Sequence, residues 1–358
     1  MNKVRYAVVG AGWISQEAFM PGVGQTGNSE IAAIVSGNAD TSRRLAEFHR
    51  VPEVVGYEDY DTLLASGRVD AVYIALPNSM HADYAIRALR RGIHALVEKP
   101  LALTVAECEA MIVAAREGGA FLMTAYRLHS EPGTMEVLER VRRGEIGTPR
   151  LFHADFSFQS GPDNHRLRAE HWGGPLQDIG VYCLNAARQI FGAEPLKCVA
   201  MEGAAAGDAR FQDVHEGLTA ILRFPNGALA SFSCSFGAAE QDRYRITGSD
   251  GIIDVERGFR FETVPKVRMI HAGGNEEWQP EPVDHFGAQT AYFSDCIRQG
   301  TPPEADGAEG LADVRALRAI EEAARTGRAV TIGGPERDRR PGPDTVRRIS
   351  RTDRRLVL

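Results

Sequence analysis

The sequence predicts an α/β protein in which a Rossmann-type, doubly wound parallel sheet is followed by an α+β domain with a large open, mainly antiparallel sheet. Residues 1–125 alternate short apolar runs with helical stretches, the pattern of βαβ units. Later runs alternate apolar and polar side chains, and turn signals such as Pro225-Asn226-Gly227 separate them, which is typical of antiparallel strands. The length of 358 residues suits two domains.

The first part of the chain supplies the parallel sheet. Strands are predicted at residues 5–10, 31–36, 71–76, 94–98 and 121–125. Helices are predicted at residues 41–50, 81–91 and 105–117. The last helix follows Thr104, with Glu107 three residues on, which is the spacing of a capping box. We therefore expect residues 1–125 to form one domain.

The second part supplies the open sheet. A helix is predicted at residues 132–143, and strands at residues 151–158, 215–224, 228–236, 243–247 and 252–255. Further helices are predicted at residues 177–191, 289–299 and 308–325. We expect this domain to span residues 126–334. Residues 335–358 hold eight arginines, four acids and three prolines, which predicts a basic, poorly ordered and solvated tail.

Composition limits the partners and the compartment. The chain has 41 Lys and Arg residues against 48 Asp and Glu residues, a formal net charge of -7, which favours neither nucleic acid nor an anionic membrane. A small-molecule substrate is expected instead. The five cysteines show no CxxC or other metal-type spacing, and no leader or 18-residue apolar span is present. These features favour a reducing, cytoplasmic location and no bound metal.

A glycine-rich turn follows the first strand. The sequence Gly10-Ala11-Gly12-Trp13-Ile14-Ser15 has the form GxGxxS. Glycines at this turn allow a tight bend and let the backbone approach a pyrophosphate at the start of the next helix. The motif is weak alone, but its place in the first βαβ unit predicts a dinucleotide-binding loop.

The end of the second strand favours NADP over NAD. The sequence there is Ser36-Gly37-Asn38, without the acid that would bind the ribose hydroxyls of NAD. Arg43 and Arg44 follow closely and could bind a 2'-phosphate. The alternative is that both arginines only solvate a helix face.

Two further segments carry groups that can move protons. Lys99 follows a predicted strand, at the edge where ligands bind in parallel sheets, although a lysine there is more often merely exposed. Asp178 and Tyr182 are four residues apart after Gly173-Gly174-Pro175 and so share one helical face. They could orient a substrate hydroxyl and exchange its proton. The alternative is a helix-start carboxylate and a buried phenol.

Four motifs occur in the order found in a known family: VVGAG, AVYIALPNSMHADYAIRAL, EKPLA and GGPLQDIGVYCLN. Together they resemble the glucose-fructose oxidoreductase/inositol dehydrogenase (Gfo/Idh/MocA) family of NAD(P)-dependent sugar oxidoreductases, most closely the glucose-fructose oxidoreductase branch. The resemblance covers residues 4–330. It implies a Rossmann domain, then an open sheet whose exposed face commonly forms a dimer interface, so a homodimer or a dimer of dimers is expected.

The resemblance also implies roles for individual residues. Lys99 matches the catalytic lysine, which precedes a proline often joined by a cis bond, and Asp178 matches the family's aspartate. Tyr182 stands where many members have a histidine, as in the branch that uses tyrosine as proton acceptor. Substrate contacts are expected from Lys99, Tyr126, Asp178 and Tyr182. Cofactor contacts are expected from Gly10, Gly12, Trp13, Ile14, Ser36, Gly37, Asn38, Arg43, Leu76, Pro77, Asn78, His81, Glu98, Lys99 and Arg127.

The expected reaction is hydride transfer between C1 of a cyclic aldose and NADP, which gives an aldonolactone. Reduction of a second sugar by a retained cofactor is a further expectation of this branch. The exported branch enzyme has a leader and an N-terminal arm around the cofactor, neither of which is evident here, so retention does not carry over directly. An inositol- or trans-dihydrodiol-type dehydrogenase and a non-catalytic NADP-binding sensor remain as alternatives.

Overall fold

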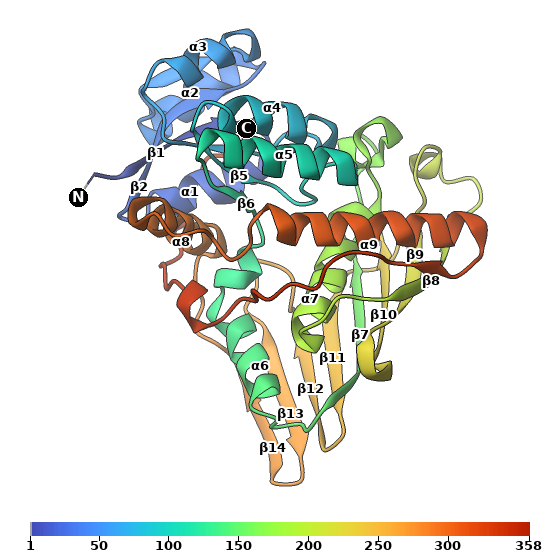
Figure 1. The fold of residues 1–358 in the computed structure, drawn as a ribbon. Coiled ribbons are helices and arrows are strands. Elements are labelled where there is room, and N and C mark those ends of the chain that lie inside the picture. The colour runs from blue at the N-terminus through green and yellow to red at the C-terminus, as the bar shows by residue number, and fades with distance from the viewer. Residues whose placement is uncertain (1) are drawn as a thin grey trace. The chain divides into compact units, whose positions relative to one another are not determined.

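In a computed structural model that describes residues 2–358, the chain divides into two units, each built from segments far apart in the sequence. Unit 1 comprises Met1–Glu131, Pro282–Leu311 and Pro343–Leu358. Unit 2 comprises Pro132–Glu281 and Ala312–Gly342. Figure 1 shows the six-stranded sheet of unit 1 and the nine-stranded sheet of unit 2. No helix within residues 2–358 is long and apolar enough to cross a membrane.

Unit 1 contains a parallel sheet with the order β3-β2-β1-β4-β5-β6. Its strands are β1 (Val4–Val9), β2 (Ser29–Val35), β3 (Glu53–Val55), β4 (Ala71–Ile74), β5 (His94–Val97) and β6 (Leu122–Thr124). Its helices include the π-helix η1 (Ser15–Phe19), α1 (Met20–Val23), α2 (Ala39–His49), α3 (Tyr60–Ala65), α4 (His81–Leu89), α5 (Val105–Gly118) and α8 (His285–Gln299). The predicted parallel sheet is confirmed, as is the capping box at Thr104 and Glu107. The short β3 and α3 were not predicted.

Helix α8 completes the core of unit 1 although it lies far along the chain. The Ser294 hydroxyl lies 2.9 Å from the Tyr6 hydroxyl and 2.8 Å from the Ser29 hydroxyl. The Asn28 amide donates to Asp295 at 2.9 Å. These contacts fix α8 against β1 and β2, so this sheet is finished by residues made long after its strands.

Unit 2 contains a nine-stranded sheet with the order β14-β13-β12-β11-β7-β10-β9-β8-β15. Its strands are β7 (Pro149–Ser157), β8 (Lys197–Gly203), β9 (Gly217–Arg223), β10 (Leu229–Ser235), β11 (Gln241–Gly248), β12 (Gly251–Glu256), β13 (Lys266–His271), β14 (Gly274–Trp278) and β15 (Val330–Thr331). The β7–β10 pair is parallel and the other pairs are antiparallel, which confirms a mainly antiparallel sheet.

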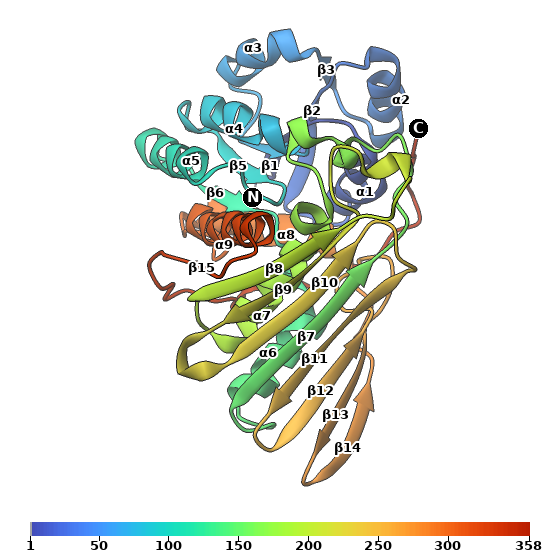
Figure 2. The same cartoon turned by 90° about the vertical axis from the view of Figure 1, so that its right-hand side faces the viewer.

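One face of this sheet is covered and the other is open. Helices α6 (Pro132–Arg142) and α7 (Val181–Phe191) lie on the covered face (Figures 1 and 2). In β7, Phe152 is buried on that face while Leu151 and His153 are exposed on the other. The alternation that predicted the strand therefore also decides which side chains face α7.

Helices α7 and α9 (Gly307–Thr326) correspond to the helices predicted at residues 177–191 and 308–325, and the first of them differs at its start. The helix expected at residues 177–191 begins as a π-helix, η7 (Leu176–Gly180), and only then becomes α7. A Cβ atom at Gly180 would lie 3.1 Å from the Cys234 sulfur, so the small residue lets this first turn lie close against β10.

The C-terminal segment is largely exposed, as its composition predicts, but it also makes specific contacts with the rest of unit 1. Arg347 pairs with Asp295 at 2.9 Å, Arg351 donates to the Val283 carbonyl at 3.1 Å, and Arg354 donates to the Phe48 carbonyl at 2.7 Å. Arg351 and Arg354 remain exposed to water, while a carboxylate and two backbone carbonyls elsewhere in unit 1 accept hydrogen bonds from the segment.

Candidate active site

The residues predicted to bind the dinucleotide follow the carboxyl ends of strands in unit 1. Residues 10–14 follow β1, residues 36–38 follow β2, residues 76–78 follow β4, residues 98–99 follow β5, and residues 126–127 follow β6. Because these strands are parallel, their carboxyl ends share one edge of the sheet. The structure therefore brings the predicted cofactor segments to the same edge.

The glycine-rich loop has the form that a pyrophosphate requires. Gly10 has a φ of +94°, and a Cβ atom there would lie 2.6 Å from the Ala75 carbonyl oxygen. At Gly12 a Cβ atom would meet nothing within 4 Å, so the space above that residue is open. The Ser15 hydroxyl donates to the Gly10 carbonyl at 2.6 Å and ties the loop to the helix that follows. A tight first glycine and an open second glycine before a helix fit a dinucleotide.

The segment after β2 is organised by its own polar side chains. The Asn38 side chain accepts from the Thr41 amide at 3.0 Å and caps α2, and the Ser36 hydroxyl accepts from the Asn38 amide at 3.2 Å. Arg43, one turn into α2, pairs with Asp40 at 2.8 Å, and both side chains are largely exposed. An exposed ion pair is weak, so Arg43 can exchange Asp40 for a phosphate at little cost.

His81 connects the segment after β4 with the segment after β5. Its Nε2 lies 2.9 Å from the Leu76 carbonyl oxygen, and its Nδ1 lies 3.0 Å from the Pro100 carbonyl oxygen. The ring is fully buried, and burial lowers its pKa although both carbonyl groups act in the opposite direction. His81 therefore joins the backbone segments that follow β4 and β5, next to Lys99.

Lys99 lies at this edge in the predicted place. It is partly exposed, and the Lys99-Pro100 bond is cis, as the family resemblance implies. The neighbouring Glu98 accepts from the Tyr73 hydroxyl at 2.8 Å and from the Lys99 amide at 3.3 Å. Burial raises the pKa of the Glu98 carboxyl, while the Lys99 charge lowers it. The lysine is thus attached to a rigid, hydrogen-bonded strand end.

Arg127 is buried, with a partner that the sequence did not indicate. Its Nη1 lies 3.0 Å from Nδ1 of the buried His285. Burial, with a further contribution from the Arg127 charge, holds the pKa of His285 well below its usual range. The neutral ring of His285 therefore accepts a hydrogen bond from the Arg127 guanidinium. Tyr126 is also buried and stacks on His129 with ring centroids 5.3 Å apart.

The catalytic candidates of unit 2, Asp178 and Tyr182, follow two glycines, Gly173 and Gly174, against which the preceding loop packs closely. A Cβ atom at Gly173 would lie 2.2 Å from the Arg166 carbonyl oxygen. The Gly174 amide donates to the same carbonyl at 2.8 Å, and Gly174 has a φ of +120°. These two glycines allow the loop at residues 165–171 to fold back over the start of η7.

The loop brings an arginine to Asp178. The Arg166 Nε lies 3.1 Å from the Asp178 Oδ1, and Asp178 is only 16% exposed. The guanidinium therefore fixes the orientation of the Asp178 carboxylate. Sequence reasoning missed Arg166, and the basic residues before Gly173-Gly174 were the available signal.

Tyr182 lies one turn beyond Asp178 and packs near two aromatic rings, one on β7 and one in the segment that follows β12. Its ring centroid is 6.0 Å from that of Phe156 and 6.3 Å from that of Phe259. The side chain is partly exposed. Its ring is therefore packed at the base while part of the residue remains accessible, as a proton-transferring phenol requires.

A second set of contacts anchors the start of η7. The Trp172 indole and the Gln177 amide both donate to the Glu321 Oε1 at 2.6 Å, and the Arg318 guanidinium lies 4.0 Å from the centroid of the Trp172 ring. None of these residues was singled out from the sequence. Through these contacts α9, more than 140 residues later in the chain, fixes the turn that contains Asp178.

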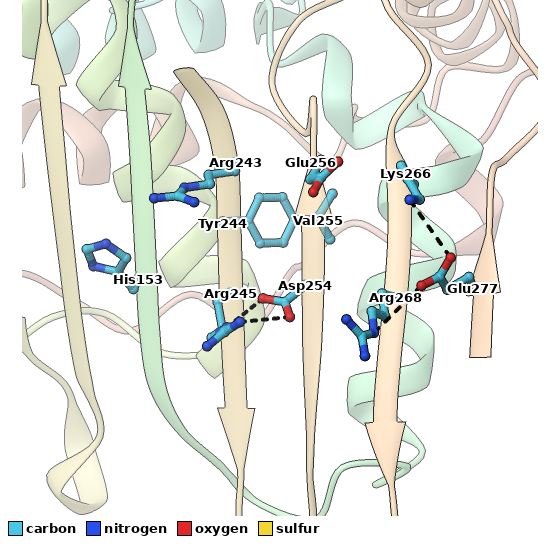
Figure 3. Close-up of a pocket in the computed structure, with 10 residues that line it drawn as sticks. All are labelled: His153, Arg243, Tyr244, Arg245, Asp254, Val255, Glu256, Lys266, Arg268 and Glu277. Carbon is cyan, nitrogen blue, oxygen red and sulfur yellow. Dashed lines mark hydrogen bonds and ion pairs between the residues drawn. The ribbon is translucent and has the colours of Figure 1, made fainter. Parts of the chain in front are cut away.

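A separate hollow lies on the open face of the nine-stranded sheet (Figure 3). Its charged side chains lie close to one another on adjacent strands, with Arg245 and Asp254 joined at 2.5 Å and Arg268 and Glu277 at 3.7 Å. His153 lies beside them on β7. No predicted catalytic residue lines this hollow, whose side chains largely neutralise one another.

Comparison with known proteins gives a consistent result. Residues 4–126 match the model of an oxidoreductase family with an NAD-binding Rossmann fold, and residues 134–254 match a GFO/IDH/MocA C-terminal domain. The NADP-dependent D-xylose 1-dehydrogenase of Haloarcula marismortui is 32% identical over 340 residues, covering 92% of this chain and 94% of that protein.

Solved structures agree with these sequence matches. The aldose-aldose oxidoreductase from Caulobacter crescentus, complexed with glycerol, has a TM-score of 0.88 at 35% identity, covering 92% of this chain and 100% of that chain. A 3-ketoreductase from Actinomadura kijaniata, in complex with NADP and TDP-benzene, has a TM-score of 0.81 at 29% identity, covering 90% and 98%.

Proposed function

The chain belongs to the Gfo/Idh/MocA oxidoreductase family, and on that basis we propose that it is an NADP-dependent sugar oxidoreductase. Similar proteins named as NADP-dependent xylose dehydrogenases and as an aldose-aldose oxidoreductase support this class of activity. More specifically, we propose oxidation at C1 of a cyclic aldose to an aldonolactone, with reduction of a second sugar as the reverse half-reaction.

The residues of unit 1 fit the cofactor. The Gly10 and Gly12 loop would hold the pyrophosphate, and Ser36, Asn38 and Arg43 would hold the phosphorylated ribose. NADP, when bound, supplies a nicotinamide that accepts the hydride leaving C1 of the sugar. Lys99, from the same edge, would direct its ammonium at the sugar hydroxyl that loses a proton.

The residues of unit 2 supply the proton acceptor. A phenol is a weak base near neutral pH, so a neighbouring ammonium is needed to stabilise the phenolate. We propose that Tyr182 takes the hydroxyl proton with that help from Lys99, while Asp178, held by Arg166, orients the sugar. The observation that favours an enzyme over a sensor is that Lys99 and Tyr182 are both present and both partly exposed.

A kinetic cycle tests these roles. Tyr182→Phe keeps the ring but removes the hydroxyl, so turnover should fall about 10²- to 10⁴-fold with little change in NADPH affinity or thermal stability. Lys99→Met should cause a similar loss. If both residues act on one substrate, the double variant should lose much less than the product of the two single losses. More than about a tenth of the wild-type turnover in Tyr182→Phe would contradict the assignment and direct attention to Asp178.

A substrate panel tests the reaction itself. Purified protein is incubated with NADP and a panel of aldoses, inositols and trans-dihydrodiols, and NADPH absorbance is followed while products are identified by mass spectrometry. Lactone formed from aldoses supports the proposal. Turnover only with inositols or dihydrodiols supports those dehydrogenases, and no turnover with bound NADP supports a sensor.

The open sheet face supports a proposed homodimer. Large apolar side chains are exposed there on neighbouring strands, including Met201 at 80%, Leu151 at 50% and Ile221 at 46%. Exposed apolar side chains that gather on one sheet face are typical of a protein–protein interface. Light scattering should give the mass of a dimer or a dimer of dimers, and Ile221→Glu with Met201→Glu should reduce it to that of a monomer.

A further inference from the structure

The C-terminal segment contacts the helix that follows the dinucleotide loop. The Leu358 amide donates to the Gln16 Oε1 at 2.7 Å, and Arg355 pairs with Glu17. Arg354 donates to the Phe48 carbonyl at 2.7 Å and lies 5.0 Å from the centroid of the Phe48 ring. Figure 2 shows this end of the chain beside α1 and α2. Residues 351–358 are therefore attached to η1 and α2 at several points.

Gln16 is bonded to the loop as well as to this segment. Its Nε2 donates to the Ala11 carbonyl at 2.6 Å, and its main-chain amide donates to the Gly12 carbonyl at 3.1 Å. The side chain is 3% exposed. One carboxamide thus accepts from Leu358 with its oxygen and donates to the loop with its nitrogen, so the two contacts share a single rigid group.

We propose that Gln16 is a positioning residue through which residues 351–358 hold the dinucleotide loop in its binding conformation and slow the release of NADP(H). Ala11 lies between the two glycines of the loop, where backbone freedom is greatest. Fixing that carbonyl reduces the ordering that cofactor binding would otherwise require. The inference rests on the NADP binding of the proposed function and is independent of which sugar reacts.

Point variants separate the two sides of the connection. Leu358→Pro removes the N–H that donates to Gln16 and leaves Gln16 in place. Gln16→Glu keeps an oxygen that accepts from Leu358 but removes the donor to Ala11. Gln16→Met removes both contacts. Val357→Ala is the matched control, because Val357 is 43% exposed in the same segment and its substitution keeps the Leu358 amide and Arg355 in place.

The measurement is the NADPH dissociation rate by stopped-flow fluorescence, with excess NADP to prevent rebinding. The loss of a single hydrogen bond predicts a rise of about 2- to 12-fold for Leu358→Pro. Gln16→Glu should raise the rate by at least as much, because its buried carboxylate also faces the Ala11 carbonyl oxygen. Adding Leu358→Pro to Gln16→Met should have no further effect, and Val357→Ala should match the wild type.

Two results would overturn the inference. The first is a wild-type release rate in both Leu358→Pro and Gln16→Glu. The second is a full additional increase when Leu358→Pro is combined with Gln16→Met, because the segment would then act independently of Gln16. Leu358 is 41% exposed, so this variant tests the inference even if the Gln16 variants fold poorly. Wild-type protein that does not bind NADPH would instead refute the proposed function.

Discussion

Gly10 and Gly12 should respond in opposite ways to the same added methyl group. Gly10→Ala places a side chain at a φ of +94°, which costs about 1–2 kcal/mol, and its Cβ would lie 2.6 Å from a backbone oxygen of Ala75. Relieving that overlap costs about 1–3 kcal/mol more. The free energy of unfolding should therefore fall by about 2–5 kcal/mol, or about 4–20 °C in melting temperature.

Gly12→Ala should leave the fold intact, because its Cβ meets nothing within 4 Å and its φ lies outside the left-handed range. The methyl group would instead occupy the space proposed for the pyrophosphate. Overpacking of about 1–3 kcal/mol corresponds to NADPH binding about 5- to 150-fold weaker. Urea unfolding of the cofactor-free variants and NADPH fluorescence titration separate the two effects. Wild-type NADPH affinity in Gly12→Ala, or equal destabilisation by both substitutions, would refute the reasoning.

Other residues support three further predictions. The protein should bind NADP more tightly than NAD, and Arg43→Ala should weaken NADP binding about 5- to 10-fold without affecting NAD, measured by titration of both cofactors; equal affinity for both would contradict this prediction. Asp313→Ala should lower the free energy of unfolding of unit 2 by about 3–5 kcal/mol in urea melts. The reason is that Arg188, fully buried and 2.6 Å from Asp313, loses one of its charge partners. The folded protein holds the pKa of His285 well below its ordinary value, so the contribution of this residue to stability should be full above pH 6.5. Below pH 6.5 the unfolded chain takes up the proton and the free energy of unfolding should fall. His285→Gln should reduce the slope of this free energy against pH by up to about 1.4 kcal/mol per pH unit, measured by urea melts from pH 7 to 5.

Local patterns predicted most of the parallel sheet and its helices. The strand runs and the Thr104 cap are encoded by neighbouring residues, and the structure has them within a few positions of the expected bounds. The strand β3 is only three residues long, too short for a periodic signal. Strand β14, at the sheet edge, has the sequence GNEEW and lacks the apolar alternation that identified the inner strands. Strand β13 does alternate, with Val267 and Met269 buried, so its signal was present in the sequence but was overlooked.

Site residues were predictable where a motif or a strand end marked them, and not where a distant contact defines their role. Lys99 and the glycine loop lie at the expected edge of the parallel sheet. The pairing of Arg127 with His285 joins residues 158 positions apart, and no local pattern encodes it. The contact between Arg166 and Asp178 depends on how a loop folds back over two glycines. Arginine-rich composition likewise concealed the contact between residues 351–358 and Gln16.

The placement of α8 affects the order in which the protein can fold during synthesis. All six strands of the parallel sheet have been made by Thr124, but the Ser294 hydroxyl that joins β1 and β2 belongs to a helix made after Pro132–Glu281, about 170 residues later. At roughly 5–20 residues per second, the nascent sheet waits about 9–34 s for that helix. During this interval the face of the sheet that α8 covers lacks its native partner, and slower translation of unit 2 would lengthen that exposure.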